Sequence, residues 1–119
     1  MHNQRIGQKG EDFAHDYLQN CGQQILNRNY RFGKGEIDII TLDKNQLVFI
    51  EVKTRLGGTR GRPLLSIHRR KQTQMIFVAN AYIQSNKREE DVRFDVITII
   101  KRGERFELEH IRNAFYPIV

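Results

Sequence analysis

The chain has 119 residues and a formal net charge of +6, with 20 basic residues against 14 acidic ones. This length predicts one domain spanning residues 1–119, which buries roughly two-thirds of its unfolded surface. Arg5, Lys9 and Glu11 interrupt the start of the chain, and no run reaches the ~20 apolar residues of a membrane span. We therefore expect no secretory signal and no membrane partner. A single cysteine, Cys21, excludes a disulfide framework and fits a cytoplasmic location.

The excess of positive charge is concentrated in one segment. Six basic residues and no acidic one lie between Thr54 and Gln72, and elsewhere basic and acidic residues are equal in number, at 14 each. The six are Arg55, Arg60, Arg62, Arg69, Arg70 and Lys71. Such a patch is the electrostatic footprint of a polyanion, and it predicts a nucleic acid as the partner.

The first part of the chain predicts a helix and then an edge strand. Apolar residues recur at helical spacing from about Gln4 to Cys21, and Gly22 marks the end of the helix. The inward stripe comprises Phe13, Ala14, Tyr17, Leu18 and Cys21. Glu11 lies along this stripe, either as a solvated carboxylate favoured by the helix dipole or as one aimed at a specific partner. Residues 24–32 alternate polar and basic side chains, which is typical of an edge strand.

Residues 35–55 predict a β-hairpin. Its strands, at 36–40 and 47–53, are joined by a tight turn at 43–45. The second strand is apolar at successive positions, as expected when both faces are covered. Alternation puts Glu51 and Lys53 on one face, and counting outward from the turn places Asp38 nearly opposite Glu51. Charges in a buried hairpin need partners, because removing them from water is costly.

The second half of the chain predicts a loop, a helix and one or two strands. Residues 54–63 form an irregular loop whose arginines favour phosphate contact. A helix follows at 66–84, with Ser66 as its N-cap and Lys71 interrupting its inward stripe. Either an anion compensates the positive charge at this helix start, or Lys71 extends past the core into solvent.

Strands at 92–100 and 106–111 complete the predicted fold. A strand, a helix and another strand imply a right-handed crossover and a parallel pair of strands. The expected fold class is therefore α/β, with a mixed central sheet flanked by helices.

The two carboxylates of the hairpin predict an oxygen-ligated metal site. Asp38 and Glu51 repel each other unless a cation lies between them or one holds a proton. The histidines and the single cysteine lack chelating spacing, so Mg²⁺ or Mn²⁺ is the expected ion. Lys53 would stabilise charge on a scissile phosphate, and Glu36 is an accessory candidate on the face of Asp38. The alternative is an ordinary charge pair between Glu51 and Lys53 at the strand end.

These residues also resemble those of known nucleases. Asp38 with Glu51-x-Lys53 resembles the PD-(D/E)xK motif of restriction-endonuclease-like phosphodiesterases, although Ile37 stands in the proline position. A closer resemblance is to the small bacterial YraN-like family, which is distantly similar to archaeal Holliday-junction resolvases. The segments that carry it are 7–18, 35–38, 48–55, 93–96 and 111–115. The resemblance implies an αβββαβ endonuclease-like core in which Glu11 joins Asp38, Glu51 and Lys53.

The leading hypothesis is a Mg- or Mn-dependent nuclease that hydrolyses DNA phosphodiester bonds. Asp38 and Glu51 would bind the metal, Lys53 would assist the attack, and Glu11 would bind a second metal or a water. The six basic residues would hold the DNA backbone, and a branched or structured substrate is suggested by family analogy alone. The alternatives are a non-catalytic nucleic-acid-binding module and a subunit active only in an assembly. Cutting two strands would require a homodimer, and residues 64–65 and 115–119 would form either its interface or part of the core.

Overall fold

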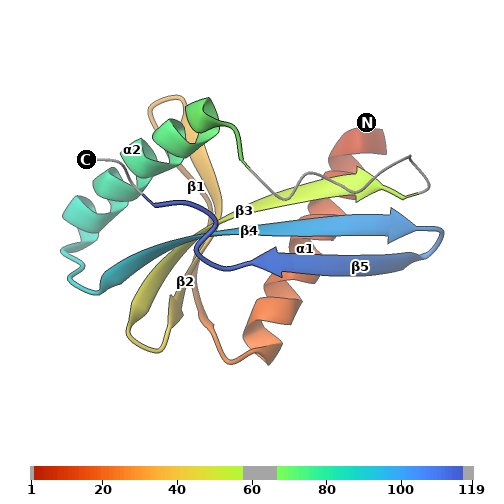
Figure 1. The fold of residues 1–119 in the computed structure, drawn as a ribbon, viewed down its shortest axis with the longest axis horizontal. Helices are drawn as coiled ribbons and strands as arrows, with labels where there is room; N and C mark the ends of the chain where they lie inside the picture. Colours follow the sequence, from red (N-terminus) through yellow and green to blue (C-terminus); the bar gives the residue numbers. More distant parts are fainter. Residues whose placement is uncertain (1, 58–66, 117–119) are drawn as a thin grey trace.

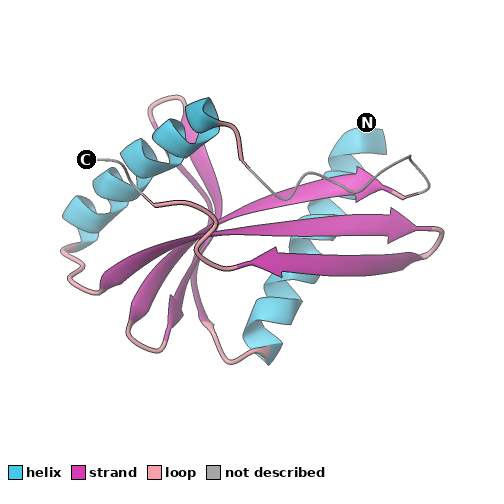
Figure 2. Cartoon of the chain, in the orientation of Figure 1, coloured by secondary structure: helices cyan, strands magenta, loops and turns pink. Residues whose placement is uncertain are grey.

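The structure is a computed structural model that describes residues 2–57 and 67–116. A five-stranded sheet carries one helix on each face (Figures 1 and 2). The elements are α1 (His2–Asn20), β1 (Gln24–Phe32), β2 (Gly35–Asp43), β3 (Gln46–Leu56), α2 (Arg69–Asn86), β4 (Asp91–Arg102) and β5 (Arg105–Ile111). Strands lie in the sheet in chain order; β3 and β4 are parallel, and the other neighbours are antiparallel. The predicted α/β class, mixed sheet and parallel pair are confirmed.

Several predictions concern residues outside this description. They are Arg60, Arg62, the N-cap Ser66, the apolar residues 64–65 and residues 117–119. Phe115, by contrast, is described and buried, and its ring stacks on Phe94 with centroids 4.8 Å apart. Phe115 therefore closes the core, which decides between the two interpretations given for it. Neither of the described helices is long and apolar enough to cross a membrane.

The helix ends follow from local sequence signals. Gly22 has a φ of 86°, and the N–H groups of Gly22 and Gln23 donate to the carbonyls of Gln19 and Leu18. This pair of bonds is the glycine C-cap that satisfies the last carbonyls of α1. The N-cap of α2 is His68, in an extended conformation and without a side-chain capping bond. The helix therefore begins later than the sequence predicted.

Two apolar cores lie on the two faces of the sheet. Ala14 and Leu18 of α1 pack against one face, and buried residues of α2 such as Met75 and Tyr82 pack against the other. The predicted burial of β3 on both faces is confirmed, since Val48 and Ile50 belong to the α1 core and Leu47 and Phe49 to the α2 core.

The predicted inward stripe of α1 is too wide. Phe13 is 37% exposed and Cys21 is exposed, whereas Ala14 and Leu18 are fully buried. Phe13 lies to the side, where its ring contacts that of Phe106, and Cys21 follows the last turn of the helix. Periodicity gave the direction of the buried face, but of the predicted stripe only Ala14 and Leu18 are fully buried against the sheet.

The sheet opens between β2 and β3 at Asp38. Their pairing runs from Asp43–Gln46 to Ile39–Ile50 and ends there. Beyond that point β2 stays paired with β1, and β3 stays paired with β4. In Figure 1 the β1–β2 turn lies beside α2, whereas the ends of β3 and β4 point away from it. Ile37 belongs to the α2 core and Ile39 to the α1 core. Because alternation would place them on one face, the backbone of β2 must rotate at Asp38.

Candidate functional site

Asp38 and Glu51 meet where the sheet opens. Continuing the β2–β3 register by one step would pair these two residues. The Asp38 carboxyl instead accepts a hydrogen bond from the main-chain N–H of Val52 at 2.8 Å and lies close enough to the Glu51 carboxyl for the two groups to interact. The structure thus brings together the two carboxyl groups that counting from the turn had placed opposite each other.

The two carboxyl groups are held in an electrostatically unfavourable arrangement. Burial, followed by the negative charge of Glu51, raises the pKa of Asp38 to about 8. At neutral pH Asp38 therefore holds a proton, which allows it to form a hydrogen bond with a second carboxyl group. Burying Asp38 next to Glu51 destabilises the folded chain, and hydrophobic packing alone does not require a carboxyl group at either position.

Two lysines lie beside this carboxyl pair. The Lys71 ammonium is 3.6 Å from Glu51 Oε1 and donates to Gln74 Oε1 at 3.1 Å. The anion that the start of α2 was expected to need is thus a carboxylate of the protein. Lys53 follows Glu51 on the same face of β3. Its pKa is lowered by burial and then by the nearby charge of Arg55, while Glu51 acts in the opposite direction.

A pocket of about 310 Å³ reaches Asp38 from the side of α1. Its lining consists of Ile6, Gly7, Glu11, Asp38, Val52, Thr54 and Leu56. Glu11 Oε1 accepts hydrogen bonds from Arg28 at 2.9 Å and from Asn29 at 3.0 Å, and its side chain is 13% exposed. Of the two interpretations given for Glu11, the structure favours the partnered one.

Sequence reasoning missed the close contact that shapes this pocket. A side chain at Gly10 would collide with that of Thr54, so only glycine lets α1 approach β3 this closely. The spacing of Gly7 and Gly10, three residues apart, was the available signal. Arg28 and Asn29 were also missed, because the sequence does not show which helix lies beside an edge strand.

The remaining predicted residues lie around the site and not within it. Glu36 forms an ion pair with Arg31 at 3.1 Å on the neighbouring strand. Arg55, Arg69 and Arg70 are exposed and form no ion pair with another described residue. These arginines flank the carboxyl pair at the end of β3 and the start of α2, which leaves their charge open to an outside anion.

The donor set fits a hard cation that keeps most of its own water. Within residues 2–57 and 67–116, no three histidine, cysteine or acidic side chains are grouped closely enough to enclose a metal ion. The opening offers two carboxyl groups in contact, which is the number that Mg²⁺ commonly takes from a protein. A divalent ion would also relieve the repulsion that now makes them share a proton. Asp38 and Glu51 therefore fit Mg²⁺ or Mn²⁺ as an open, partly hydrated site.

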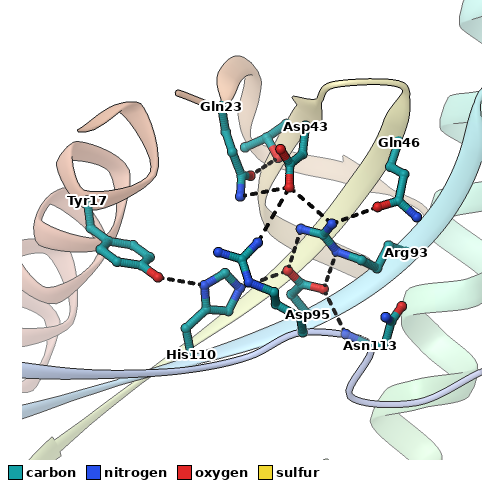
Figure 3. Close-up of polar contacts among 10 residues, drawn as sticks. Tyr17, Gln23, Asp43, Gln46, Arg93, Asp95, His110 and Asn113 are labelled. Carbon is teal, nitrogen blue, oxygen red and sulfur yellow. Dashed lines mark hydrogen bonds and ion pairs between the residues drawn. The ribbon is translucent and has the colours of Figure 1, made fainter. Parts of the chain in front are cut away.

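A second charged cluster lies near the other end of the hairpin and is fully satisfied (Figure 3). Asp95 is completely buried and accepts hydrogen bonds from Arg93 Nε and Nη2, His110 Nε2 and the N–H of Asn113, at 2.8–3.1 Å. Burial acts to raise the pKa of Asp95, but the bonds from His110 and Arg93 outweigh it and lower the pKa. Tyr17 extends the cluster to α1 through a 2.9 Å bond to His110 Nδ1. This cluster joins elements and leaves no charge unpaired.

The sequence of this chain matches a known protein family. The model of the family described as "Uncharacterised protein family UPF0102" matches residues 10–99. A UPF0102 protein of Chlorobium chlorochromatii is 45% identical over 117 residues, covering 93% of this chain and 91% of the relative. One from Thermodesulfovibrio yellowstonii is 46% identical over 111 residues, covering 93% and 96%. One from Bacteroides fragilis is 38% identical over 112 residues, covering 94% and 93%.

Proposed function

This chain belongs to the UPF0102 family, that of the YraN-like proteins, and we propose that it is a metal-dependent nuclease that hydrolyses phosphodiester bonds in DNA. The observation that carries the proposal is the contact between Asp38 and Glu51 at the opening of the sheet, beside Lys53 and Lys71. A restriction-endonuclease-like relationship is part of the same proposal. It is supported by the order of helices and strands and by the placement of Asp38 and Glu51 on neighbouring strands.

Each residue of the site has a distinct role in this proposal. Asp38 and Glu51 would hold Mg²⁺ or Mn²⁺, and Asp38 would give up its proton as the ion binds. The bound ion would supply a polarised phosphoryl oxygen and a water of lowered pKa. Lys53 would place its ammonium against the charge that develops on the scissile phosphate. Lys71 holds the Glu51 carboxylate in position through its 3.6 Å contact.

Other residues would position the substrate. Arg55, Arg69 and Arg70 would bind phosphates on either side of the scissile one, because arginine binds phosphate oxygens through paired N–H groups. Glu11, held by Arg28 and Asn29, lies in the wall of the pocket where a water would approach Asp38.

Cleavage assays on labelled DNA test this proposal. Purified protein with Mg²⁺ or Mn²⁺ should cut at least one of three substrates: a single strand, a duplex or a branched junction. Asp38→Ala and Lys53→Ala should each lower the rate by about 100-fold or more. Glu36→Gln is the matched control, because it alters an acid on the same strand that pairs with Arg31 outside the site. Equal cleavage by Asp38→Ala, Lys53→Ala and the unaltered protein would contradict the assignment.

A non-catalytic nucleic-acid-binding module is the second candidate. It is favoured by one observation: the described residues contain no group of three metal-ligating side chains. Such a module would bind DNA through its arginines without needing a divalent ion at Asp38. This candidate predicts that the protein binds DNA but cleaves none of the three substrates. Absence of cleavage by the protein alone would argue against the nuclease, and absence of cleavage in host-cell extract as well would argue against a subunit active only in an assembly. If a junction is cut in two strands, sedimentation should show a homodimer.

A further inference from the structure

Two aromatic rings are exposed together on the α2 side of the molecule. Phe32 at the end of β1 is 44% exposed, and Phe77 on α2 is 56% exposed. Their ring centroids are 5.4 Å apart with an interplanar angle of 50°. Single exposed apolar side chains are common on protein surfaces, but a contiguous aromatic pair is a feature of binding surfaces.

The position of this aromatic pair is fixed by close packing. The turn after Phe32 lies against α2: a Cβ atom on Gly35 would come within 2.9 Å of Gln74 Cγ. Gly33 has a φ of 60°, which glycine adopts without strain. In Figure 1 the same turn lies beside the first half of α2. The positions of the two rings are therefore fixed by the packing of the tight β1–β2 turn against α2.

A short series of contacts connects the pair to the carboxyl site. Gln74, which touches the turn, accepts a hydrogen bond from Lys71, and Lys71 lies 3.6 Å from Glu51. Along the sheet, Phe32 pairs with Gly35, three residues before Asp38. At about 3.3 Å per residue this separation is about 10 Å. It equals about three nucleotides of a stacked strand at about 3.4 Å each.

The charges around the pair suit a nucleic acid strand. Phe77 follows Arg70 by seven residues and so lies on the same side of α2. Lys34 is exposed in the turn directly after Phe32 and Gly33. Neither Arg70 nor Lys34 forms an ion pair with another described residue. Aromatic rings beside open cations provide a face for a base and contacts for its phosphates.

The chain contains a second aromatic pair with the same geometry and different surroundings. Phe13 and Phe106 also have ring centroids 5.4 Å apart and an interplanar angle of 50°. Phe13 is preceded by Asp12, and Asp16 lies three residues later on α1. Phe106 is only partly exposed, unlike Phe32 and Phe77, so the second pair offers less free ring surface to a base and serves as a matched control.

We propose that Phe32 and Phe77 form a stacking platform for an unpaired base of the DNA substrate. The inference rests on the proposed nuclease function and narrows its substrate class. Bases inside a duplex are already stacked on both sides and offer no free face. The substrate would therefore carry unpaired nucleotides about three positions from the cleaved bond, as in single strands, forks and branches.

Binding measurements on paired and unpaired DNA test the platform. Fluorescence anisotropy would be recorded in EDTA, which prevents cleavage, with a labelled single strand and with the duplex of the same sequence. Phe77→Leu should weaken single-strand binding about tenfold, because base stacking on a ring is lost, and should change duplex binding by less than about twofold. Phe13→Leu should change neither. A fluorescent adenine analogue in the single strand should be quenched by the unaltered protein and not by Phe77→Leu.

The outcomes separate the platform from the proposed function. The platform would be overturned, and the nuclease left intact, if the unaltered protein binds and cleaves DNA and both Phe77→Leu and Phe32→Leu bind the single strand with unchanged affinity. Absence of DNA binding by the unaltered protein would overturn both. A change from dimer to monomer in Phe77→Leu by light scattering, with unchanged single-strand binding, would show that the pair contacts a second copy of the chain instead of a base.

Discussion

Asp38 and Asp95 are two aspartates of one sheet whose surroundings act on them in opposite directions. Asp95 is completely buried and receives four donated hydrogen bonds, including two from Arg93, which lower its pKa. Asp38 receives one main-chain N–H and faces the Glu51 carboxyl, and its pKa is raised to about 8. The cluster around Asp95 uses its charges to hold the fold together (Figure 3). Asp38 and Glu51 are held in an unfavourable arrangement of two carboxyl groups, and a bound cation would relieve their repulsion. Protein donors thus distinguish the aspartate that joins the fold together from the one that we propose binds a ligand.

Replacing Asp95 should have the largest effect on stability. Asp95→Asn keeps the shape but removes one of the two acidic partners of Arg93, whose side chain is 5% exposed and which keeps its ion pair with Asp43. Leaving a buried charge fully unpaired costs about 3–5 kcal/mol; because Asp43 still pairs with Arg93, we expect a loss of up to that size in the free energy of unfolding measured in urea. Glu107→Gln is the matched control, because it removes the acid of an exposed pair with Arg102 and should cost less than about 1 kcal/mol. If Asp95→Asn cost no more than this control, the cluster would not be structural.

Replacing Asp38 should have a smaller effect of the opposite sign. Asp38→Asn removes one of two carboxyl groups in contact, so the free energy of unfolding at about pH 8 should rise by about 0.5–2 kcal/mol. The same variant should lose cleavage, because a carboxyl ligand is gone. The measurements are urea unfolding and the DNA cleavage rate. A loss of stability close to that of Asp95→Asn would make Asp38 a structural residue and contradict the comparison.

The gain from Asp38→Asn should shrink as the pH falls. The pKa of Asp38 is about 8 in the folded chain against an ordinary value of 3.8. Between these values the folded chain holds a proton that the unfolded chain has lost, so the stability of the unaltered protein falls as pH rises. At about pH 5 Asp38 is neutral in the folded chain and the cost of its proton uptake is lower, so the gain should be smaller than at pH ~8. Urea unfolding at several pH values checks this, and a gain independent of pH would contradict it.

The stabilisation by Asp95 should depend on pH in the other direction. Its pKa is lowered from the ordinary value of 3.8. The contribution is therefore fully present above about pH 4 and is lost as the pH falls through the lowered pKa.

The fold and the carboxyl pair were predictable because they depend on local signals. The turn fixes the register of a hairpin, so counting from Lys44 sufficed to place Asp38 opposite Glu51. Glycine at position 22 marked the end of α1 through its positive φ. The long gap between β3 and β4, filled by a helix, required a crossover and a parallel pair.

Other features were not predictable because they depend on how distant elements pack. Glu36 was placed with Asp38 by alternation, but β2 rotates between Ile37 and Ile39, and Glu36 pairs with Arg31. No local pattern indicates that Asp95 on β4 would meet His110 on β5, which in turn bonds Tyr17 on α1.

Calorimetric titration with Mn²⁺ tests the central claim, that Asp38 and Glu51 form a cation site. Performed near pH 7 in two buffers of different ionisation enthalpy, it measures affinity and the number of protons released. Saturable binding should release about one proton per ion, because Asp38 must give up its proton, and should disappear in Asp38→Asn while persisting in Glu107→Gln. The claim is contradicted if the unaltered protein binds no Mn²⁺, or if Asp38→Asn binds it equally well and with the same proton release.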